Sequence, residues 1–437
     1  MRSKNFDPFD FKKKIINGVP VYYKNIPWAP CIHVNVVFNG GATADPKEKE
    51  GLAHFMEHIT LKGSPKLPDY KSWRDWRKKY TFLTANAVTS YYSVSYPLKC
   101  LPKDFKKVMS DLKDTIFNCF LKTEDIESER NVILQESWGK YKNEKYLKYI
   151  KETRKNLYKD HIYENLYSSL GWPETIKKIT PEDVRNFYKD NYGVGNFSII
   201  LVGNIENKNI TSLEDFIKDL PKVKNKVNQI KKQEIKKPRK KILKFKAEEI
   251  GLVKEQVEIS IMRVAEKLNE NMVFVSLISK SLLQEILNDK FRVEHKICYG
   301  VAVGSSFDKY SSTLSMNINT EEKNIRMVLA GFKEIIEKFS SNFYKQKFED
   351  TKLLFKNNSK VKEHLSEDII NYARNNLATY EKIPSLKENL KLIEKVQFQD
   401  IQKFIKDMFG DEDKFYTEII LPSKKEDEKY KKKNAKK

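Results

Sequence analysis

The two halves of the chain show nearly the same order of strand-like and helix-like segments. In the first half, residue periodicity predicts strands after residue 19, a short helix at 51–63, a strand at 84–98, helices at 102–121 and 124–145, and a strand at 197–203. In the second half it predicts a strand at 255–262, a helix at 271–288, strands at 299–305 and 313–318, and a helix at 322–339. The sequence therefore predicts an α+β protein with two similar domains of mixed or antiparallel sheet and packed helices, joined by a linker.

The length of 437 residues also favours two domains, because it exceeds what one hydrophobic core usually supports. Residues 222–245 carry eleven Lys or Arg and one Glu, which is typical of a solvated linker. We expect a first domain over residues 1–220, a basic linker over 221–246, a second domain over 247–423 and a disordered basic tail over 424–437.

The formal net charge of +22 raises the alternative of a nucleic-acid-binding protein. However, residues 222–245 and 424–437 together hold +15 of that charge, and the sequence has no RNP-like, zinc-finger or helix-turn-helix signature. We therefore expect no nucleic-acid partner. The chain also has no run of about 18 apolar residues and no signal-peptide pattern, so we expect a cytoplasmic protein without a membrane anchor.

Three polar residues share one face of the short helix predicted at 51–63. His54, Glu57 and His58 stand at i, i+3 and i+4, positions that lie side by side on a helix. Two imidazoles at this spacing can bind one zinc ion, and a carboxylate between them can accept a proton from water. The order H-x-x-E-H is the inverted form of the zinc-peptidase motif. The pattern predicts a zinc site, although a chance pair of histidines on a helix surface is the alternative.

A zinc site needs a third protein ligand, and the helix predicted at 124–145 offers one. Glu129 and Glu136 are seven residues apart and so lie on one helix face, with Val132 and Ile133 between them expected to pack inward. We predict Glu136 as the third ligand. The alternative is a solvated charged face, which is the commonest environment of a helical glutamate.

Two sequence motifs together resemble a known family. The segment GLAHFMEHITLKG at residues 51–63 is followed by ERNVILQE at residues 129–136, so that 78 positions separate His58 from Glu136. In both motifs and in their spacing the chain resembles the insulinase and pitrilysin superfamily of zinc metallopeptidases. It is most similar to the short two-domain members, such as the mitochondrial processing peptidase β-subunit and bacterial processing-peptidase-like enzymes.

The resemblance implies roles for individual residues. It implies zinc ligands at His54, His58 and Glu136, with Glu57 as general base and Glu129 as the residue that orients the ligand helix. It implies a substrate-binding edge strand at Asn86, Ala87 and Thr89, and it matches Arg292 and Tyr299 to the family's Arg/Tyr pair, which contacts the substrate and the oxyanion.

The function that follows is a zinc-dependent endopeptidase. Its substrate would be a peptide or an unfolded polypeptide segment, bound as an added β-strand in a closed chamber. A homodimer is the simplest assembly, and a heterodimer is the other possibility. The alternative within the superfamily is a non-catalytic partner or scaffold subunit, whose zinc motif would normally be incomplete.

Overall fold

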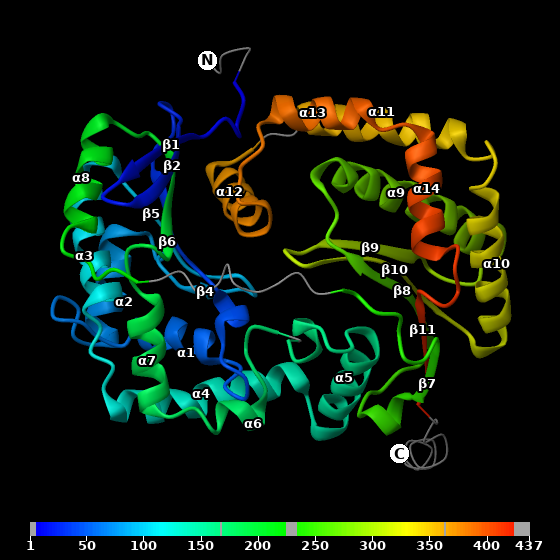
Figure 1. Cartoon of the computed structure of the whole chain (residues 1–437), viewed down its shortest axis with the longest axis horizontal. Helices are drawn as coiled ribbons and strands as arrows, with labels where there is room; N and C mark the ends of the chain where they lie inside the picture. Colours follow the sequence, from blue (N-terminus) through cyan, green and yellow to red (C-terminus); the bar gives the residue numbers. More distant parts are fainter. Residues whose placement is uncertain (1–5, 167, 224–233, 362–363, 424–437) are drawn as a thin grey trace, which may run out of the picture. The chain divides into compact units, whose positions relative to one another are not determined.

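The computed structural model describes residues 6–166, 168–223, 234–361 and 364–423 (Figure 1). It confirms the predicted α+β class, with two sheets and packed helices. The predicted tail at 424–437 lies outside the described residues, and so do residues 224–233 of the predicted linker. None of the helices in the described ranges is long and apolar enough to cross a membrane.

The chain forms two compact units, and each unit contains segments from both halves of the sequence. The first unit consists of residues 1–140, 166–232 and 361–391, and the second consists of residues 141–165, 233–360 and 392–437. The predicted boundaries near residues 220 and 246 divide the chain in sequence order. They therefore do not describe the exchange in which residues 141–165 belong to the second unit and residues 361–391 to the first. They stay predictions, and each unit is described by itself below.

The sheet of the first unit has six strands in the order β1-β2-β6-β3-β5-β4. Its strands are β1 (Lys12–Ile16), β2 (Val19–Asn25), β3 (Ile32–Asn39), β4 (Val88–Thr89), β5 (Ser93–Cys100) and β6 (Phe197–Gly203). Only the β2–β6 pair is parallel. The single strand predicted at 84–98 is divided by a turn into β4 and β5, and β4 forms one edge of the sheet.

Helices cover both faces of this sheet. The helices are α1 (Leu52–Ile59), α2 (Tyr70–Tyr80), α3 (Phe105–Phe117), α4 (Thr123–Tyr141), α6 (Pro173–Ile176), α7 (Pro181–Asn191), α8 (Asn207–Ile217) and α12 (Ser366–Tyr380). One face forms the main core with α1, α3, α7 and α8. The other face packs against α12, whose Ile369 and Ile370 join Ile200 and Val37 in a second apolar cluster.

The sheet of the second unit repeats this topology with five strands in the order β7-β11-β8-β10-β9. The strands are β7 (Ile242–Lys246), β8 (Val257–Glu266), β9 (Val301–Phe307), β10 (Ser311–Thr320) and β11 (Tyr416–Leu421). As in the first unit, only one pair is parallel, here β7 with β11. The order matches β2-β6-β3-β5-β4, which supports the predicted internal duplication; strand β1 is additional to the first unit.

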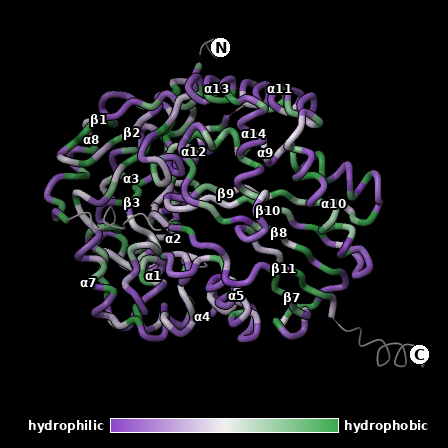
Figure 2. Tube along the Cα trace, turned by 45° about the vertical axis from the view of Figure 1, so that its right-hand side comes forward, coloured by the Kyte–Doolittle hydropathy of each residue, from purple (hydrophilic) through white to green (hydrophobic). Residues whose placement is uncertain are grey.

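The second half contributes further helices, of which the first two match the helices predicted at residues 271–288 and 322–339. They are α9 (Glu270–Asn288), α10 (Ile325–Lys338), α11 (Lys345–Val361), α13 (Leu386–Lys395) and α14 (Phe398–Phe409). Helix α5 (Glu144–Leu157), from the first half of the sequence, packs against the sheet of the second unit through Leu157, which belongs to the same apolar cluster as Leu243 and Tyr416. Figure 2 shows hydrophobic and hydrophilic stretches alternating along helices such as α10, as expected for helices with one face in a core.

A buried carboxyl group fastens α5 to this sheet. Glu418 on β11 accepts hydrogen bonds from the hydroxyls of Tyr149 and Tyr416, both at 2.6 Å, and from Thr153 at 3.4 Å. Burial raises the pKa of Glu418 above its ordinary value, although the tyrosine donors counteract part of this effect. At a pH between the unfolded-state and folded-state pKa values of Glu418, its carboxyl group therefore keeps a proton in the folded protein that it releases in the unfolded chain.

The raised pKa predicts how Glu418 affects stability. Its protonated form stabilises the fold fully below about pH 4.5, and this contribution is lost as the pH rises through the higher folded-state pKa. We expect the Tm of Glu418→Gln, relative to that of the parent protein, to rise by roughly 2 to 4 °C from pH 5 to pH 8, because only the parent loses this contribution. The change corresponds to about 1 kcal/mol. Thermal unfolding at both pH values, with the exposed Glu255→Gln as the matched control, checks this. A difference in Tm that does not change with pH would contradict it.

Candidate metal centre

Helix α1 is held at its start by a partly buried acidic side chain. The Asp45 carboxyl accepts the backbone N–H groups of Gly51 and Ala53, each at 2.7 Å. Gly51 has a φ of 105°, and an added Cβ there would lie 2.8 Å from the carbonyl oxygen of Leu170, so only glycine fits. Burial raises the pKa of Asp45 to about 8 despite the two donors. The direction of α1 is thus fixed before its functional side chains begin.

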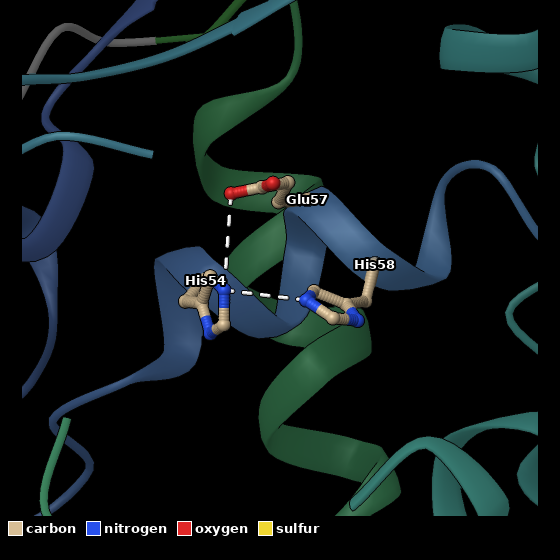
Figure 3. A group of neighbouring side chains, drawn as sticks. All are labelled: His54, Glu57 and His58. Atoms are coloured by element: carbon tan, nitrogen blue, oxygen red, sulfur yellow. Dashed lines mark hydrogen bonds and ion pairs between the residues drawn. The ribbon is translucent and has the colours of Figure 1, made fainter. Parts of the chain in front are cut away.

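One face of α1 enters the core and the other carries the predicted motif. Leu52, Phe55, Met56 and Ile59 are almost completely buried. On the opposite face the Nε2 atoms of His54 and His58 lie 3.2 Å apart, and Glu57 Oε2 lies 3.9 Å from His54 Nε2 (Figure 3). In the described part of the chain these three residues form the group of side chains that could hold a metal ion.

Helix α4 brings a second carboxylate to the two imidazoles. Glu136 Oε2 lies 3.5 Å from the Nε2 atom of His54 and 3.5 Å from that of His58. The three atoms form a triangle with sides of 3.2, 3.5 and 3.5 Å. Ligands at zinc distances in a tetrahedral site are about 3.3 Å apart, so this donor set fits a zinc ion.

The packing of α4 differs in one respect from the prediction. Ile133 is fully buried as expected, but the Val132 side chain is 42% exposed. A residue next to a buried one is turned by about 100° around the helix, so both cannot face the same narrow core. Ile133, together with the buried Ile126, therefore anchors the helix that carries both glutamates.

The ring of His58 is oriented by Glu129. Glu129 Oε1 lies 2.8 Å from His58 Nδ1, and its other carboxylate oxygen pairs with the ammonium group of Lys62. This hydrogen bond keeps the proton on Nδ1 and turns Nε2 toward His54, as in many metal sites where a carboxylate supports a histidine ligand. Lys62, one turn after His58, and Asp45 were not recognised from the sequence, because single charged residues beside a motif give no pattern.

The two imidazoles have different electrostatic environments. Burial, and then the neighbouring His58, lower the pKa of His54 to about 3, so its imidazole is neutral and its Nε2 can act as a ligand. Burial works to lower the pKa of His58, but its hydrogen bond to Glu129 and the nearby glutamates raise the pKa overall. A bound cation would compete with that extra proton. Burial also raises the pKa of Glu57, which Thr89 on β4 partly counteracts.

The predicted substrate-binding residues lie at the edge of the same sheet. Asn86 is exposed and Ala87 is buried, and Thr89 belongs to β4, which pairs with β5 on one side only. Just before this strand, Phe82 and Leu83 have φ values of 52° and 61° and are half exposed. This left-handed backbone conformation is unfavourable for large side chains, and both residues come directly before the segment that forms the edge strand.

The predicted Arg/Tyr pair lies in the second unit, whereas the histidine cluster lies in the first. Arg292 belongs to a π-helical turn (Asp289–Glu294), and its guanidinium carbon is 5.2 Å from the ring centre of Tyr299. The Tyr299 side chain is 91% exposed. The two residues are therefore adjacent, and the tyrosine hydroxyl is available to solvent.

Comparison with known proteins places this geometry in a family. Residues 21–168 match the family described as "Insulinase (Peptidase family M16)", and residues 178–355 match its "Peptidase M16 inactive domain". The chain is 26% identical over 212 residues to an uncharacterized zinc protease of Rickettsia felis, covering 46% of this chain and 47% of that protein. It is 29% identical over 209 residues to the mitochondrial-processing peptidase subunit beta of Neurospora crassa, covering 46% of this chain and 41% of that protein. The chain thus matches less than half of the length of these relatives.

Solved structures share the fold. The periplasmic protease PqqL of Escherichia coli superimposes with a TM-score of 0.76 at 16% identity, over 94% of this chain and 47% of the PqqL chain. A peptidase M16 inactive domain from Pseudomonas fluorescens superimposes with a TM-score of 0.77 at 16% identity, over 95% of this chain and 98% of that one. With both sequence matches, the repeated topology and the histidine cluster in place, the chain belongs to the insulinase family of peptidases, M16.

Proposed function

We propose that this protein is a zinc-dependent endopeptidase. The observation that carries the proposal is the triangle formed by His54 Nε2, His58 Nε2 and Glu136 Oε2, with the Glu57 carboxylate beside it. Three protein ligands leave a fourth position open, which distinguishes a catalytic zinc site from a structural one. The zinc proteases among the relatives support the same assignment.

A zinc ion held by these residues would lower the pKa of a water molecule and polarise the carbonyl group of a peptide. Glu57 accepts the proton of the attacking water and can then return a proton to the leaving amine. Glu129 and Lys62 keep the His58 ring in place during both steps.

The substrate is a peptide or an unfolded polypeptide segment. Strand β4 is an edge strand, and its unpaired backbone groups can accept an extended peptide as an additional strand. Because β4 lies against α1, a peptide added at residues 86–89 passes close to Glu57. Recognition through the backbone favours loose sequence selectivity, with side-chain preferences set by neighbours such as Phe82 and Leu83.

The roles of the motif residues can be separated by zinc content and activity. We expect Glu57→Gln to retain zinc but to lose peptidase activity by roughly 100- to 10,000-fold, because the amide cannot accept the proton. His54→Ala, His58→Ala and Glu136→Gln should instead lower the zinc content. Elemental analysis and cleavage of a mixed peptide library, with and without a chelator, provide the readouts.

The matched control is Glu124→Gln, an exposed residue at the start of the same helix as Glu136, which should leave both readouts unchanged. Loss of zinc in Glu57→Gln would show that Glu57 is a ligand. A parent protein that binds no zinc and cleaves no peptide would instead favour the non-catalytic partner subunit.

We further propose that Arg292 and Tyr299 complete the site of another copy of the chain. The metal ligands and the edge strand belong to one unit and the Arg/Tyr pair to the other. The chain also matches only 47% of the PqqL chain, so two copies would supply a length comparable to that protein. In this assembly Tyr299 would donate a hydrogen bond to the oxyanion that forms from the peptide carbonyl.

Mixing two inactive variants tests this arrangement. Glu57→Gln and Tyr299→Phe are each expected to be impaired by about 100-fold or more. After subunit exchange, the mixture should recover about a quarter of the parent activity, because half of the dimers are mixed and each mixed dimer has one intact site. Native mass spectrometry establishes the exchange. A mixture that exchanges subunits but recovers nothing would show that each site is completed within its own chain.

A further inference from the structure

The internal duplication extends from the sheets to individual helix positions. A short 3-10 turn and then a helix follow β5 in the first unit and β10 in the second, so that α3 and α10 correspond. Helices α7 and α14, which precede β6 and β11, correspond in the same way. Lys113 is the ninth residue of α3 and Lys333 is the ninth residue of α10.

Equivalent hydrogen bonds confirm this register. Arg185 on α7 donates to the carbonyl oxygen of Leu121, and Gln402 on α14 donates to that of Ser341. Leu121 and Ser341 are the same number of residues beyond Lys113 and Lys333, respectively. The two units can therefore be compared position by position.

In the first unit, α8 follows β6 and packs against α3. The Lys113 ammonium group donates to the carbonyl oxygens of Asp215 at 3.0 Å and Lys218 at 2.6 Å, near the last turn of α8. The Phe216 ring meets the Phe117 ring edge-on at 6.0 Å. The apolar side of α8 is buried in this contact and in the core below it, through Ile210, Leu213, Phe216 and Ile217.

In the second unit, no helix of the described chain follows β11, because the described residues end at 423. The corresponding face of α10 instead lines a cavity of about 820 Å³. Lys333 and Ile336, which occupy the positions of Lys113 and Ile116, stand on its wall. Ile261 of β8 and Thr417 of β11 also line it, and both residues are otherwise buried.

The cavity is apolar inside and basic at its rim. Phe332, Phe409 and Phe415 form an aromatic cluster along one side, with ring centres 5.2 to 6.5 Å apart. The charged lining residues are Lys241, Lys333, Lys403, Lys406, Glu337 and Glu412. Lys333 pairs with Glu412 and Lys241 with Asp413. Among the described residues Lys403 and Lys406 have no carboxylate partner, and Glu337, at the position of Phe117, has no cationic partner, so the unpaired charges are two lysines and one glutamate. The rim therefore favours an acidic occupant.

The chain's own C-terminal segment does not match this chemistry. Residues 424–437 lie outside the described residues, and their sequence contains eight lysines, three acidic residues and no apolar periodicity. Such a segment cannot supply an apolar helix face, and its charge has the same sign as the rim.

We propose that this cavity is a docking site for an amphipathic helix of another polypeptide, placed as α8 is placed on α3. The expected helix has apolar residues at the spacing of Ile210, Leu213 and Phe216, and acidic side chains beside them that meet Lys403 and Lys406. Its length is close to the 11 residues of α8. The proposal does not depend on peptidase activity.

A peptide with the α8 sequence is the probe. A fluorescent peptide spanning residues 205–219 is expected to bind the full-length protein with a Kd on the order of 10 to 100 µM, measured by anisotropy. Ile336→Glu, and the double change Lys403→Glu with Lys406→Glu, should each weaken binding at least tenfold. Met327→Glu, an exposed position on α10 outside the cavity, and Lys360→Glu on α11 are the matched controls and should leave Kd unchanged.

Several outcomes would overturn the proposal. An absence of peptide binding is one, and binding that the cavity variants do not weaken is another. Binding that tightens tenfold when residues 424–437 are deleted would identify the tail as the occupant. Binding of dodecanoate that depends on Ile336, without peptide binding, would identify a small amphiphile instead. A change of less than about 3 °C in the Tm of each variant establishes that the fold is intact.

Discussion

A β-sheet buried on both faces has to be covered twice, and this requirement determines how the two units are built. In the first unit the second cover is α12, whose Ile369 and Ile370 pack on Ile200. In the second unit it is α5, whose Leu157 packs on Leu243. Each cover comes from the other half of the sequence, so neither half of the chain can bury its own sheet completely. Helix α1, which carries the two histidines, packs on the opposite face of the sheet of the first unit. The metal centre therefore rests on a sheet whose other face is covered by α12, a helix from the second half of the sequence.

The geometry of the metal centre is imposed by packing rather than by local preference. Helix α1 has eight residues, which is too short to be stable in water alone. Its apolar face in the core and the Asp45 carboxyl at its start hold it in place. The distance between the two histidine Nε2 atoms is therefore a property of the whole first unit.

Residue patterns predicted the elements whose periodicity is strong and the site residues that belong to a spaced motif. The structure brings together His54, Glu57, His58, Glu129 and Glu136 as the spacing indicated. Patterns did not indicate the exchange of α5 and α12, because an amphipathic helix does not specify which of two similar sheets it will cover. They also placed Val132 in the core, since two adjacent apolar residues give no information about which one turns inward.

Lys62 and Asp45 could not be found for a related reason. Each acts through one contact with a residue that is distant in the sequence or part of the backbone, and such contacts leave no periodic trace. The roles of Arg292 and Tyr299 came only from the resemblance, because a single arginine seven residues before a tyrosine is common in any sequence.

The exchanged helices also affect how the protein folds during its synthesis. The sheet of the first unit is complete once β6 has left the ribosome, but its second cover, α12, is made more than 160 residues later. At the usual rates of translation this is an interval of roughly 10 to 30 s, during which Val37, Ile200 and Val202 have no cover from α12. A nascent chain of this kind presents an apolar sheet face long enough for chaperones to bind, and the first unit cannot complete its packing until α12 has been synthesised.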